Sequence, residues 1–352
     1  MTAFRHSRLR LVLLALGWLG LVAACIAALA FQPVHIGRMV MPPEQRIAVL
    51  VALALVLHLL TAWTWMALRA LLRLVGVKGP RSWIERPAVR ATLLGTLLAF
   101  AALLGYGRWV EPGWLAVRHV PLGQVGAPGA RPLRIAVLSD LHVDGWRAPF
   151  IDVSATVRRL EPDVVIFLGD SLGRRDALPL LHRVLQDIEA PLGCYAVRGN
   201  WEAWYYNDLP LLQGTHFRWL DDELVTLERA GTRVHLAGLA YTDDEDGARA
   251  QRRLAAVSID DWRVLLFHTP DLVDAVPSAD LVLSGHTHGG QVAIPGFGAL
   301  VTLAKTGKRF ERGLVRAGHT WVYTTPGIGV EPAIPLRLGV RPEVTLIELW
   351  PK

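Results

Sequence analysis

The sequence predicts an α/β domain that follows an N-terminal membrane-spanning helical region. Of its 352 residues, 52% are hydrophobic and only 19% are charged, which is more apolar than is usual for a soluble protein of this length. Apolar segments long enough to cross a bilayer lie within residues 1–110. After residue 132, short apolar runs alternate with helix-compatible stretches, which is the pattern of buried strands joined by helices.

Three apolar segments predict transmembrane helices, at residues 11–31, 47–68 and 91–107. A helix rises about 1.5 Å per residue, so the 21 residues of the first segment are enough to cross about 30 Å of hydrocarbon. The third segment has 17 residues and is marginal, and the topology depends on it. A cleaved signal peptide is the alternative for the first segment, but its apolar core exceeds the roughly 7–15 residues that are usual there.

Basic residues in the loops between these segments predict the orientation. Lys and Arg accumulate on the cytoplasmic side of a membrane, and residues 69–90 contain six of them against two in residues 32–46. The N-terminus and residues 69–90 are therefore expected in the cytoplasm. Three spans would place the chain after residue 110 outside the cytoplasm, whereas two would place it inside.

The net charge of +6 comes entirely from the N-terminal third of the chain. Residues 1–110 contain twelve Lys and Arg against two Glu, and residues 111–352 contain 25 basic and 29 acidic residues. A slightly acidic domain has no bulk attraction for a phosphate backbone, so nucleic acid is not an expected partner.

Residues 111–132 predict a linker and a first strand, and residues 133–352 predict one domain. Five apolar runs, each ending in polar or glycine-containing residues, predict its buried strands: 133–140, 163–170, 193–200, 263–270 and 279–286. Residues 150–161 and 176–189 are compatible with helices. We therefore expect an α/β architecture with a sheet that is covered on both faces.

Metal-competent side chains stand at the ends of all five runs: Asp140, His142, Asp170, Asn200, His268, His286 and His288. Such ends are where a sheet positions functional groups. His286 and His288 are one residue apart and point the same way on a strand. One Asp after a strand is usually a cap or turn residue, and an isolated His-x-His is usually part of a turn. Five such ends together predict a metal site.

These motifs occur in a recognisable order: D-x-H at 140–142, G-D at 169–170, G-N at 199–200, His268 and G-H-x-H at 285–288. The sequence thereby resembles the calcineurin-like, or purple acid phosphatase-like, metallophosphoesterase superfamily over residues 115–350. "SDLHVDG", "HTPD", "SGHTHGGQV" and "PLRLGVRPEVTLIEL" are similar to its membrane-associated bacterial branch of predicted phosphohydrolases. The resemblance implies a four-layer α/β/β/α sandwich.

The resemblance also implies a centre of two metal ions. One ion would be bound by Asp140, His142 and His288, the other by Asn200, His268 and His286, and Asp170 would bridge both. Two cations about 3.5–4 Å apart can bind phosphoryl oxygens, lower the pKa of a water and offset charge on the leaving oxygen. Mixed carboxylate, amide and imidazole ligands favour divalent or trivalent Mn, Fe or Zn over Mg or Ca.

The third motif departs from the superfamily pattern. The family usually has G-N-H-[DE], where this chain has Gly199-Asn200-Trp201-Glu202. The missing His is the group expected to protonate the leaving oxygen, which is worth about 10²–10⁴ in rate, and an indole cannot transfer that proton. Glu202 and His216 are candidate substitutes, and Asp170 and Asn200 complete the expected catalytic set. Trp201 either fills space or favours leaving groups that depart without a proton.

The leading functional prediction is a membrane-anchored hydrolase of phosphodiester or pyrophosphate bonds that acts through a metal-activated water on lipid-linked or envelope substrates. It would be a multi-pass protein of the bacterial inner (cytoplasmic) membrane with an extracytoplasmic catalytic domain. If the domain is cytoplasmic, the resemblance implies a UDP-2,3-diacylglucosamine-type pyrophosphatase of lipid A synthesis. A catalytically weak metal-binding membrane scaffold is the third alternative. The expected partners are a phosphate-ester substrate and the membrane, and the sequence points to no protein partner.

Overall fold

The computed structural model describes residues 35–36, 39–40, 43–76, 86–124, 131–145, 148–242, 247–332 and 334–352. The chain divides into two compact units, Met1–Leu104 and Gly105–Lys352. The membrane span predicted at residues 11–31 lies outside the described residues.

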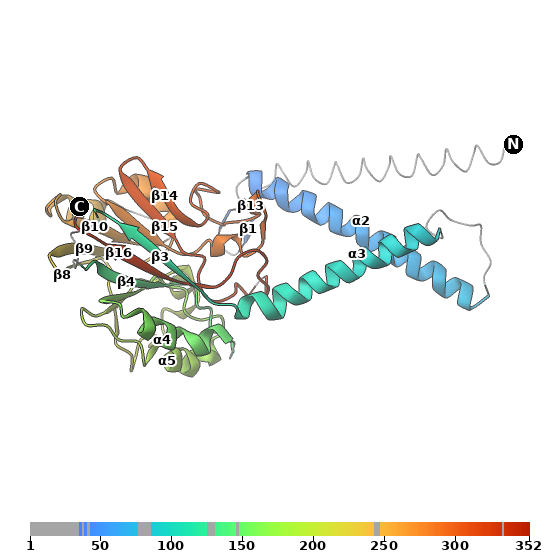
Figure 1. Ribbon diagram of the computed structural model, residues 1–352, viewed down its shortest axis with the longest axis horizontal. Coiled ribbons are helices and arrows are strands. Elements are labelled where there is room, and N and C mark those ends of the chain that lie inside the picture. The colour runs from blue at the N-terminus through green and yellow to red at the C-terminus, as the bar shows by residue number, and fades with distance from the viewer. Residues whose placement is uncertain are drawn as a thin grey trace. The chain divides into compact units, whose positions relative to one another are not determined.

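The first unit contains two long apolar helices, α2 (Pro43–Leu74) and α3 (Pro87–Gly105), and a short pair of strands, β1 (His35–Ile36) and β2 (Met39–Val40) (Figure 1). Trp63 of α2 is buried, and its Nε1 donates to Oγ1 of Thr96 on α3 at 3.3 Å. Gln45–Leu74 and Pro87–Gly113 are long and apolar enough to cross a membrane, and almost none of either is buried. Unburied apolar helices suit a lipid environment rather than the core of a soluble protein.

The second unit is built on two six-stranded sheets. The first contains, in spatial order, β3 (Ala116–Leu122), β16 (Glu343–Leu349), β4 (Leu133–Leu138), β5 (Val164–Phe167), β6 (Cys194–Ala196) and β7 (Phe217–Trp219). The second contains β14 (Gly313–Ala317), β15 (Thr320–Thr324), β11 (Leu281–Ser284), β10 (Trp262–Leu266), β9 (Thr232–Gly238) and β8 (Glu223–Arg229). The strands from β4 to β7 run parallel in the first sheet, as do β9, β10, β11 and β15 in the second.

The remaining elements of this unit are short. Its α-helices are α4 (Ala148–Leu160), α5 (Leu178–Leu185) and α6 (Ala248–Ala255). Single turns and short helices are η2 (Tyr106–Val110), η3 (Glu111–Gly113), η4 (Arg175–Ala177), η5 (Glu202–Tyr206), η6 (Pro270–Ala275) and η7 (His288–Gly290). β12 (Ala293–Ile294) and β13 (Gly298–Ala299) form a separate hairpin.

Hydrophobic cores on both sides of each sheet give the unit four layers. Ile135 and Val137 of β4 pack against residues of the second sheet such as Val264, whereas the alternate residue Ala136 packs with α4 and α5. This alternation follows from the two-residue period of a strand. A third core joins the outer face of the second sheet to α6 and η6. The order of layers is therefore α/β/β/α, as the family resemblance implied.

The five predicted strands are β4, β5, β6, β10 and β11, and they lie in two different sheets. The sequence analysis expected one sheet covered on both faces, but each sheet has helices on one face and the other sheet on the opposite face. The helix predicted at 150–161 is α4, and the one at 176–189 is η4 followed by α5, which ends at Leu185.

Candidate metal centre

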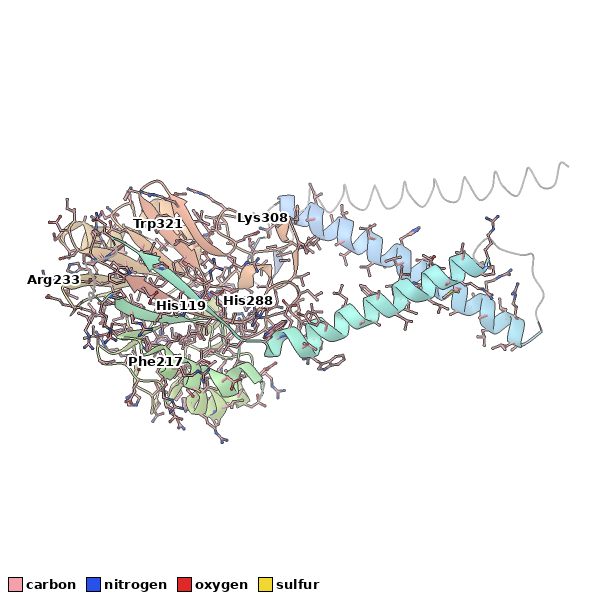
Figure 2. The ribbon with its side chains drawn as sticks, in the orientation of Figure 1. His119, Phe217, Arg233, His288, Lys308 and Trp321 are labelled. Carbon is pink, nitrogen blue, oxygen red and sulfur yellow. The ribbon has the colours of Figure 1, made fainter. Side chains whose placement is uncertain are left out.

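All seven predicted ligands follow the carboxyl ends of parallel strands. Asp140 and His142 follow β4, Asp170 follows β5, Asn200 follows β6, His268 follows β10, and His286 and His288 follow β11. Figure 2 shows His288 and Arg233, which lies near the amino end of β9, toward opposite ends of this unit. The predicted ligands therefore share one end of the two sheets.

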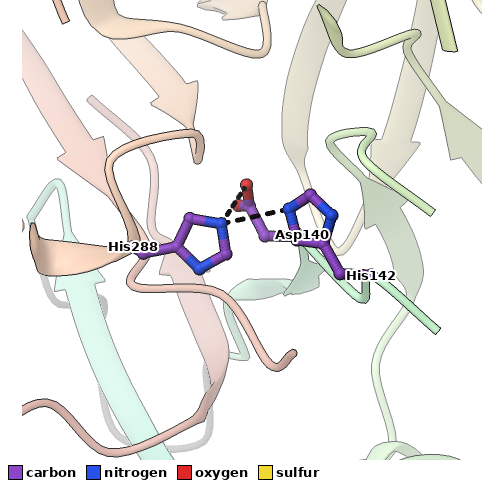
Figure 3. A group of neighbouring side chains, drawn as sticks. All are labelled: Asp140, His142 and His288. Atoms are coloured by element: carbon purple, nitrogen blue, oxygen red, sulfur yellow. Dashed lines mark hydrogen bonds and ion pairs between the residues drawn. The ribbon is translucent and has the colours of Figure 1, made fainter. Parts of the chain in front are cut away.

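Six of these residues form two buried clusters. The first cluster is Asp140, His142 and His288, and the second cluster is Asp170, His268 and His286. Within each cluster the candidate ligand atoms lie within 4.8 Å of one another. Figure 3 shows His288 facing the carboxylate of Asp140 and the imidazole of His142. Side chains from distant parts of the chain thus converge on a common point.

The distances in the first cluster fit a common cation. Nε2 of His288 is 3.1 Å from Nε2 of His142 and 3.4 Å from Oδ1 of Asp140. Two donor atoms bound at about 2.1 Å to one cation lie about 3.0–3.7 Å apart when the bonds make an angle of about 90–125°. In the cation-free site one of these two ring nitrogens can donate a hydrogen bond to the other, and in a loaded site both lone pairs would face the cation.

Asp170 belongs to the second cluster but also lies close to the first. Its Oδ2 is 3.2 Å from Nε2 of His268 in the second cluster and 3.6 Å from Nε2 of His142 in the first. Its Oδ1 accepts a hydrogen bond from the backbone N–H of Trp201 at 2.9 Å, which fixes the carboxylate. One carboxylate within reach of both donor sets is the arrangement that a bridging ligand requires.

Hydrogen bonds outside the clusters orient the imidazoles of the second cluster. Nδ1 of His268 is 2.7 Å from the carbonyl of Leu168, so an Nδ1–H donates there and Nε2 faces Asp170. That Nε2 is buried and lies 3.2 Å from Oδ2 of Asp170, outside regular hydrogen-bond geometry. Nδ1 of His286 is 3.0 Å from Oδ1 of Asn200, which adds the amide to this donor set. A buried ring nitrogen that faces a carboxylate in this way fits a metal ligand.

Burial dominates the electrostatics of both clusters. It lowers the pKa of His142 and His288 well below the ordinary value and lowers that of His286 to about 3, so these rings are neutral. Burial raises the pKa of Asp140 and Asp170. Although burial also opposes the charged form of His268, the two carboxylates raise its pKa above the usual range. Without a cation, Asp170 and His268 therefore retain a proton that a metal ion would displace.

The backbone at the site adopts conformations that L-residues rarely use. Positive φ angles occur at Asp140 (51°), His142 (38°), Asp170 (57°), His286 (68°) and His288 (50°). Left-handed conformations at non-glycine residues persist only where the surrounding structure holds them, and they cluster at functional sites. A Cβ at Gly199 would lie 2.2 Å from Oδ1 of Asp170, so this position requires glycine.

Glu202 holds two of the ligand-bearing loops together. It is fully buried, and its carboxylate accepts hydrogen bonds from the backbone N–H groups of Asp170, Ser171 and Gly199 at 2.7–2.8 Å and from the hydroxyl of Ser171 at 2.6 Å. These four hydrogen bonds hold the carboxylate against the backbone of both loops. This geometry suits a residue that positions the loops, whereas the sequence analysis considered Glu202 as a substitute proton donor.

Trp201 contacts the first cluster directly. Its indole meets the ring of His142 edge-on, with the ring centroids 4.8 Å apart, and also packs against Tyr205. His216 is exposed in the turn before β7 and belongs to neither cluster. Its predicted role as a substitute acid therefore gains no support from this geometry.

Three residues near the clusters were missed by the sequence analysis: Gln291, Glu331 and Arg337. Oε2 of Glu331 is 3.7 Å from Nε2 of His142. Gln291 bonds the backbone of Glu331, and the fully buried Arg337 donates to the carbonyls of Pro326 and Gly329. None of the three ends a predicted strand, although Gln291 and Arg337 lie within the family-like runs "SGHTHGGQV" and "PLRLGVRPEVTLIEL".

Comparisons with known proteins agree with this geometry. Residues 133–290 match a family model described as calcineurin-like phosphoesterase. The uncharacterized metallophosphoesterase YkuE of Bacillus subtilis (strain 168) is 28% identical over 267 residues, covering 70% of this chain and 89% of that protein. Phosphodiesterase YaeI of Escherichia coli (strain K12) is 29% identical over 276 residues, covering 72% and 94%. A transmembrane protein with metallophosphoesterase domain from Bos taurus is 31% identical over 291 residues, covering 75% of this chain but 62% of that protein.

Proposed function

We propose that this chain, which carries a calcineurin-like phosphoesterase domain, is a metal-dependent hydrolase of phosphodiester or pyrophosphate bonds in lipid-linked or envelope substrates. The single observation that carries the proposal is the position of Asp170, whose carboxylate lies within 3.6 Å of ligand nitrogens in both clusters. A bound pair of cations would polarise the phosphoryl group and lower the pKa of the attacking water.

The chain's own residues prepare this site for paired cations. His142, His286 and His288 are neutral because burial lowers their pKa, so each ring has one lone pair that could bind a cation. Asn200 adds an amide oxygen, and Glu202 fixes the loops that carry Asp170 and Asn200. This donor set of carboxylate, amide and imidazole suits Mn, Fe or Zn.

Trp201 stands next to the first cluster in place of the family's histidine. An indole next to the reacting phosphoryl group would exclude water but supply no proton to the leaving oxygen. Aryl and phosphate leaving groups depart without protonation, whereas an alkyl alkoxide does not. We therefore assign the enzyme to diesters or pyrophosphates with good leaving groups.

Exposed apolar side chains near the site support a lipid-linked substrate. We define an apolar rim as Ile294, Phe297 and Ile334, whose exposed fractions are 47%, 51% and 44%. Gln291 ties the rim to the site, since it follows His288 by three residues and donates to the carbonyl of Ile334. Exposed apolar side chains of this kind can contact another apolar body, and the ring of Phe297 also has Nζ of Lys308 4.3 Å from its centroid. We assign the apolar rim to the acyl chain of a substrate whose phosphate ester is bound at the metal site.

Membrane association is indicated by the two apolar helices and by relatives named transmembrane proteins. We propose a multi-pass protein of the bacterial inner membrane with an extracytoplasmic catalytic domain, because basic residues are concentrated in residues 69–90. A reporter that works only outside the cytoplasm should be active when it is fused after residue 112. If only a reporter that works in the cytoplasm is active there, the result would instead favour a UDP-2,3-diacylglucosamine-type pyrophosphatase.

Hydrolysis of bis-p-nitrophenyl phosphate by purified, Mn²⁺-loaded full-length protein tests the proposed activity. Asp170→Ala should abolish turnover, whereas the control Asp176→Ala should retain it, because Asp176 is 68% exposed and belongs to neither cluster. A wild-type protein that binds cations but shows no turnover would favour the scaffold alternative. For the substrate class, Ile294→Ser with Phe297→Ser should lower kcat/KM on a long-chain lipid-linked diester while leaving that on the soluble diester unchanged.

A further inference from the structure

We propose that Glu331 is an additional ligand of the cation bound by the first cluster. Its Oε2 lies 3.7 Å from Nε2 of His142, the ring nitrogen that also faces His288. The side chain of Glu331 is 24% exposed, whereas that of His142 is fully buried, so the carboxylate reaches the cluster from the solvent side. This residue stands outside the five strand-end motifs that define the site.

The geometry around His142 is that of neighbouring donors on one cation. From its Nε2, the distances are 3.1 Å to Nε2 of His288, 3.6 Å to Oδ2 of Asp170 and 3.7 Å to Oε2 of Glu331. All three fall within about 3.0–3.7 Å, the separation of ligand atoms that share a cation with bonds of about 2.1 Å. The separation for Glu331 differs by 0.1 Å from that for Asp170. By its distance to His142 Glu331 is placed as Asp170 is, although neither residue joins Asp140, His142 and His288 in the group whose ligand atoms all lie within 4.8 Å of one another.

The charge of the site favours a further carboxylate. The two clusters contribute two carboxylates, Asp140 and Asp170, against two cations of at least two charges each. The guanidinium of Arg337 adds positive charge next to the first cluster. It is fully buried, and its Nη2 is 3.5 Å from Nδ1 of His288. Uncompensated buried charge is costly, so an anionic ligand at the mouth of the first cluster would stabilise the loaded site.

The loop that carries Glu331 is fixed from two sides. Oε1 of Gln291 accepts from the backbone N–H of Glu331 at 2.7 Å, and Nε2 of Gln291 donates to the carbonyl of Ile334. Arg337 donates to the carbonyls of Gly329 at 2.8 Å and Pro326 at 2.9 Å. The chain segment that supplies His288 thus also positions Glu331, because Gln291 follows His288 by three residues. A ligand on a held loop loses less entropy on binding than one on a free loop.

An added carboxylate should change which metal the first cluster prefers. Carboxylate oxygens suit harder cations such as Mn²⁺, whereas imidazoles suit Zn²⁺ equally well. Glu331 therefore raises the preference of the first cluster for Mn²⁺ over Zn²⁺. The inference rests on the proposed metal centre, and metal binding distinguishes the two failures. Wild-type protein that binds no Mn²⁺ contradicts the proposed function, whereas unchanged Mn²⁺ affinity in Glu331→Gln contradicts only the inference.

Isothermal titration of metal-free, full-length protein with Mn²⁺ tests this inference. Glu331→Gln keeps the size of the side chain but removes its charge, and we expect the affinity of one of the two Mn²⁺ sites to fall about 10–100-fold while the other is unchanged. The affinity for Zn²⁺ should fall less. The matched control is Glu161→Gln, because Glu161 is 79% exposed and belongs to neither cluster.

A second variant keeps the test decisive if Glu331→Gln folds poorly. Gln291→Ala leaves the carboxylate in place but releases the loop, so Mn²⁺ affinity should fall in the same direction and at the same site. Melting curves of the metal-free variants separate loss of fold from loss of a ligand. Unchanged Mn²⁺ affinity at both sites in a folded Glu331→Gln or Gln291→Ala protein would overturn the inference.

Discussion

The Nε2 atoms of His142 and His288 lie 3.1 Å apart, although the two residues are separated by 146 positions in the chain. Burial keeps both rings neutral by lowering their pKa. At this distance one neutral ring can donate a hydrogen bond from its Nε2–H to the other, and a bound cation would replace that proton. The fold therefore holds the two rings at the separation that two ligands of one cation need.

Metal removal should lower the melting temperature of the protein. A ligand at about a hundred times its Kd stabilises the folded state by about 2.7 kcal/mol, which for a domain of this size raises Tm by roughly 5–10 °C. We expect this rise when Mn²⁺ is added to chelator-treated protein, as followed by differential scanning fluorimetry. His288→Ala should lose most of the rise and Asp176→Ala should keep it. An equal rise in both variants would mean that the metal stabilises the protein elsewhere.

Metal affinity should increase with pH. In the cation-free protein, Asp170 and Asp140 raise the pKa of His268 above its usual value, so the ring is protonated near neutrality. A cation must displace that proton, and for one displaced proton the apparent affinity falls about tenfold for each pH unit below the raised pKa. Titrations with Mn²⁺ between about pH 6 and about pH 8, in buffers of different ionisation enthalpy, should show proton release. Affinity that is independent of pH would contradict this assignment.

Glu202→Gln should reduce stability and activity together. The amide nitrogen would face a backbone N–H that the carboxylate now accepts from, and each hydrogen bond to a charged group contributes about 1.5–3 kcal/mol. We expect a lower Tm and a lower kcat, with both limbs of the pH–rate profile at their original positions. Disappearance of the alkaline limb alone, with Tm unchanged, would instead identify Glu202 as the general acid.

Trp201→His should make the enzyme less sensitive to its leaving group. The wild-type rate should rise steeply with leaving-group acidity, because no residue at this position protonates the departing oxygen. A histidine restores a proton donor beside His142, so rates on poor leaving groups should rise by up to about 10²-fold. A series of aryl and alkyl diesters measures both slopes. Equal slopes for the two proteins would show that Trp201 only fills space.

The strand ends that carry the seven candidate ligands were predictable from the sequence, because a buried parallel strand has a short apolar signature and ends in polar residues. The presence of two sheets came from the family resemblance, since periodicity alone does not show which strands pair. The edge strands β8 and β14 were missed because their residues are mostly only partly buried. Glu331 was missed because no strand places it, and its position depends on side-chain bonds from Gln291 that no local pattern reveals.

The location of bound cations tests the account most directly. Anomalous diffraction from crystals of the Mn²⁺-loaded full-length protein should show two peaks, one on each side of Asp170. The first should be bounded by the first cluster and Glu331, and the second by the second cluster and Asn200. A single peak away from Asp170, or none at these side chains, would contradict the proposed centre and the chemistry derived from it.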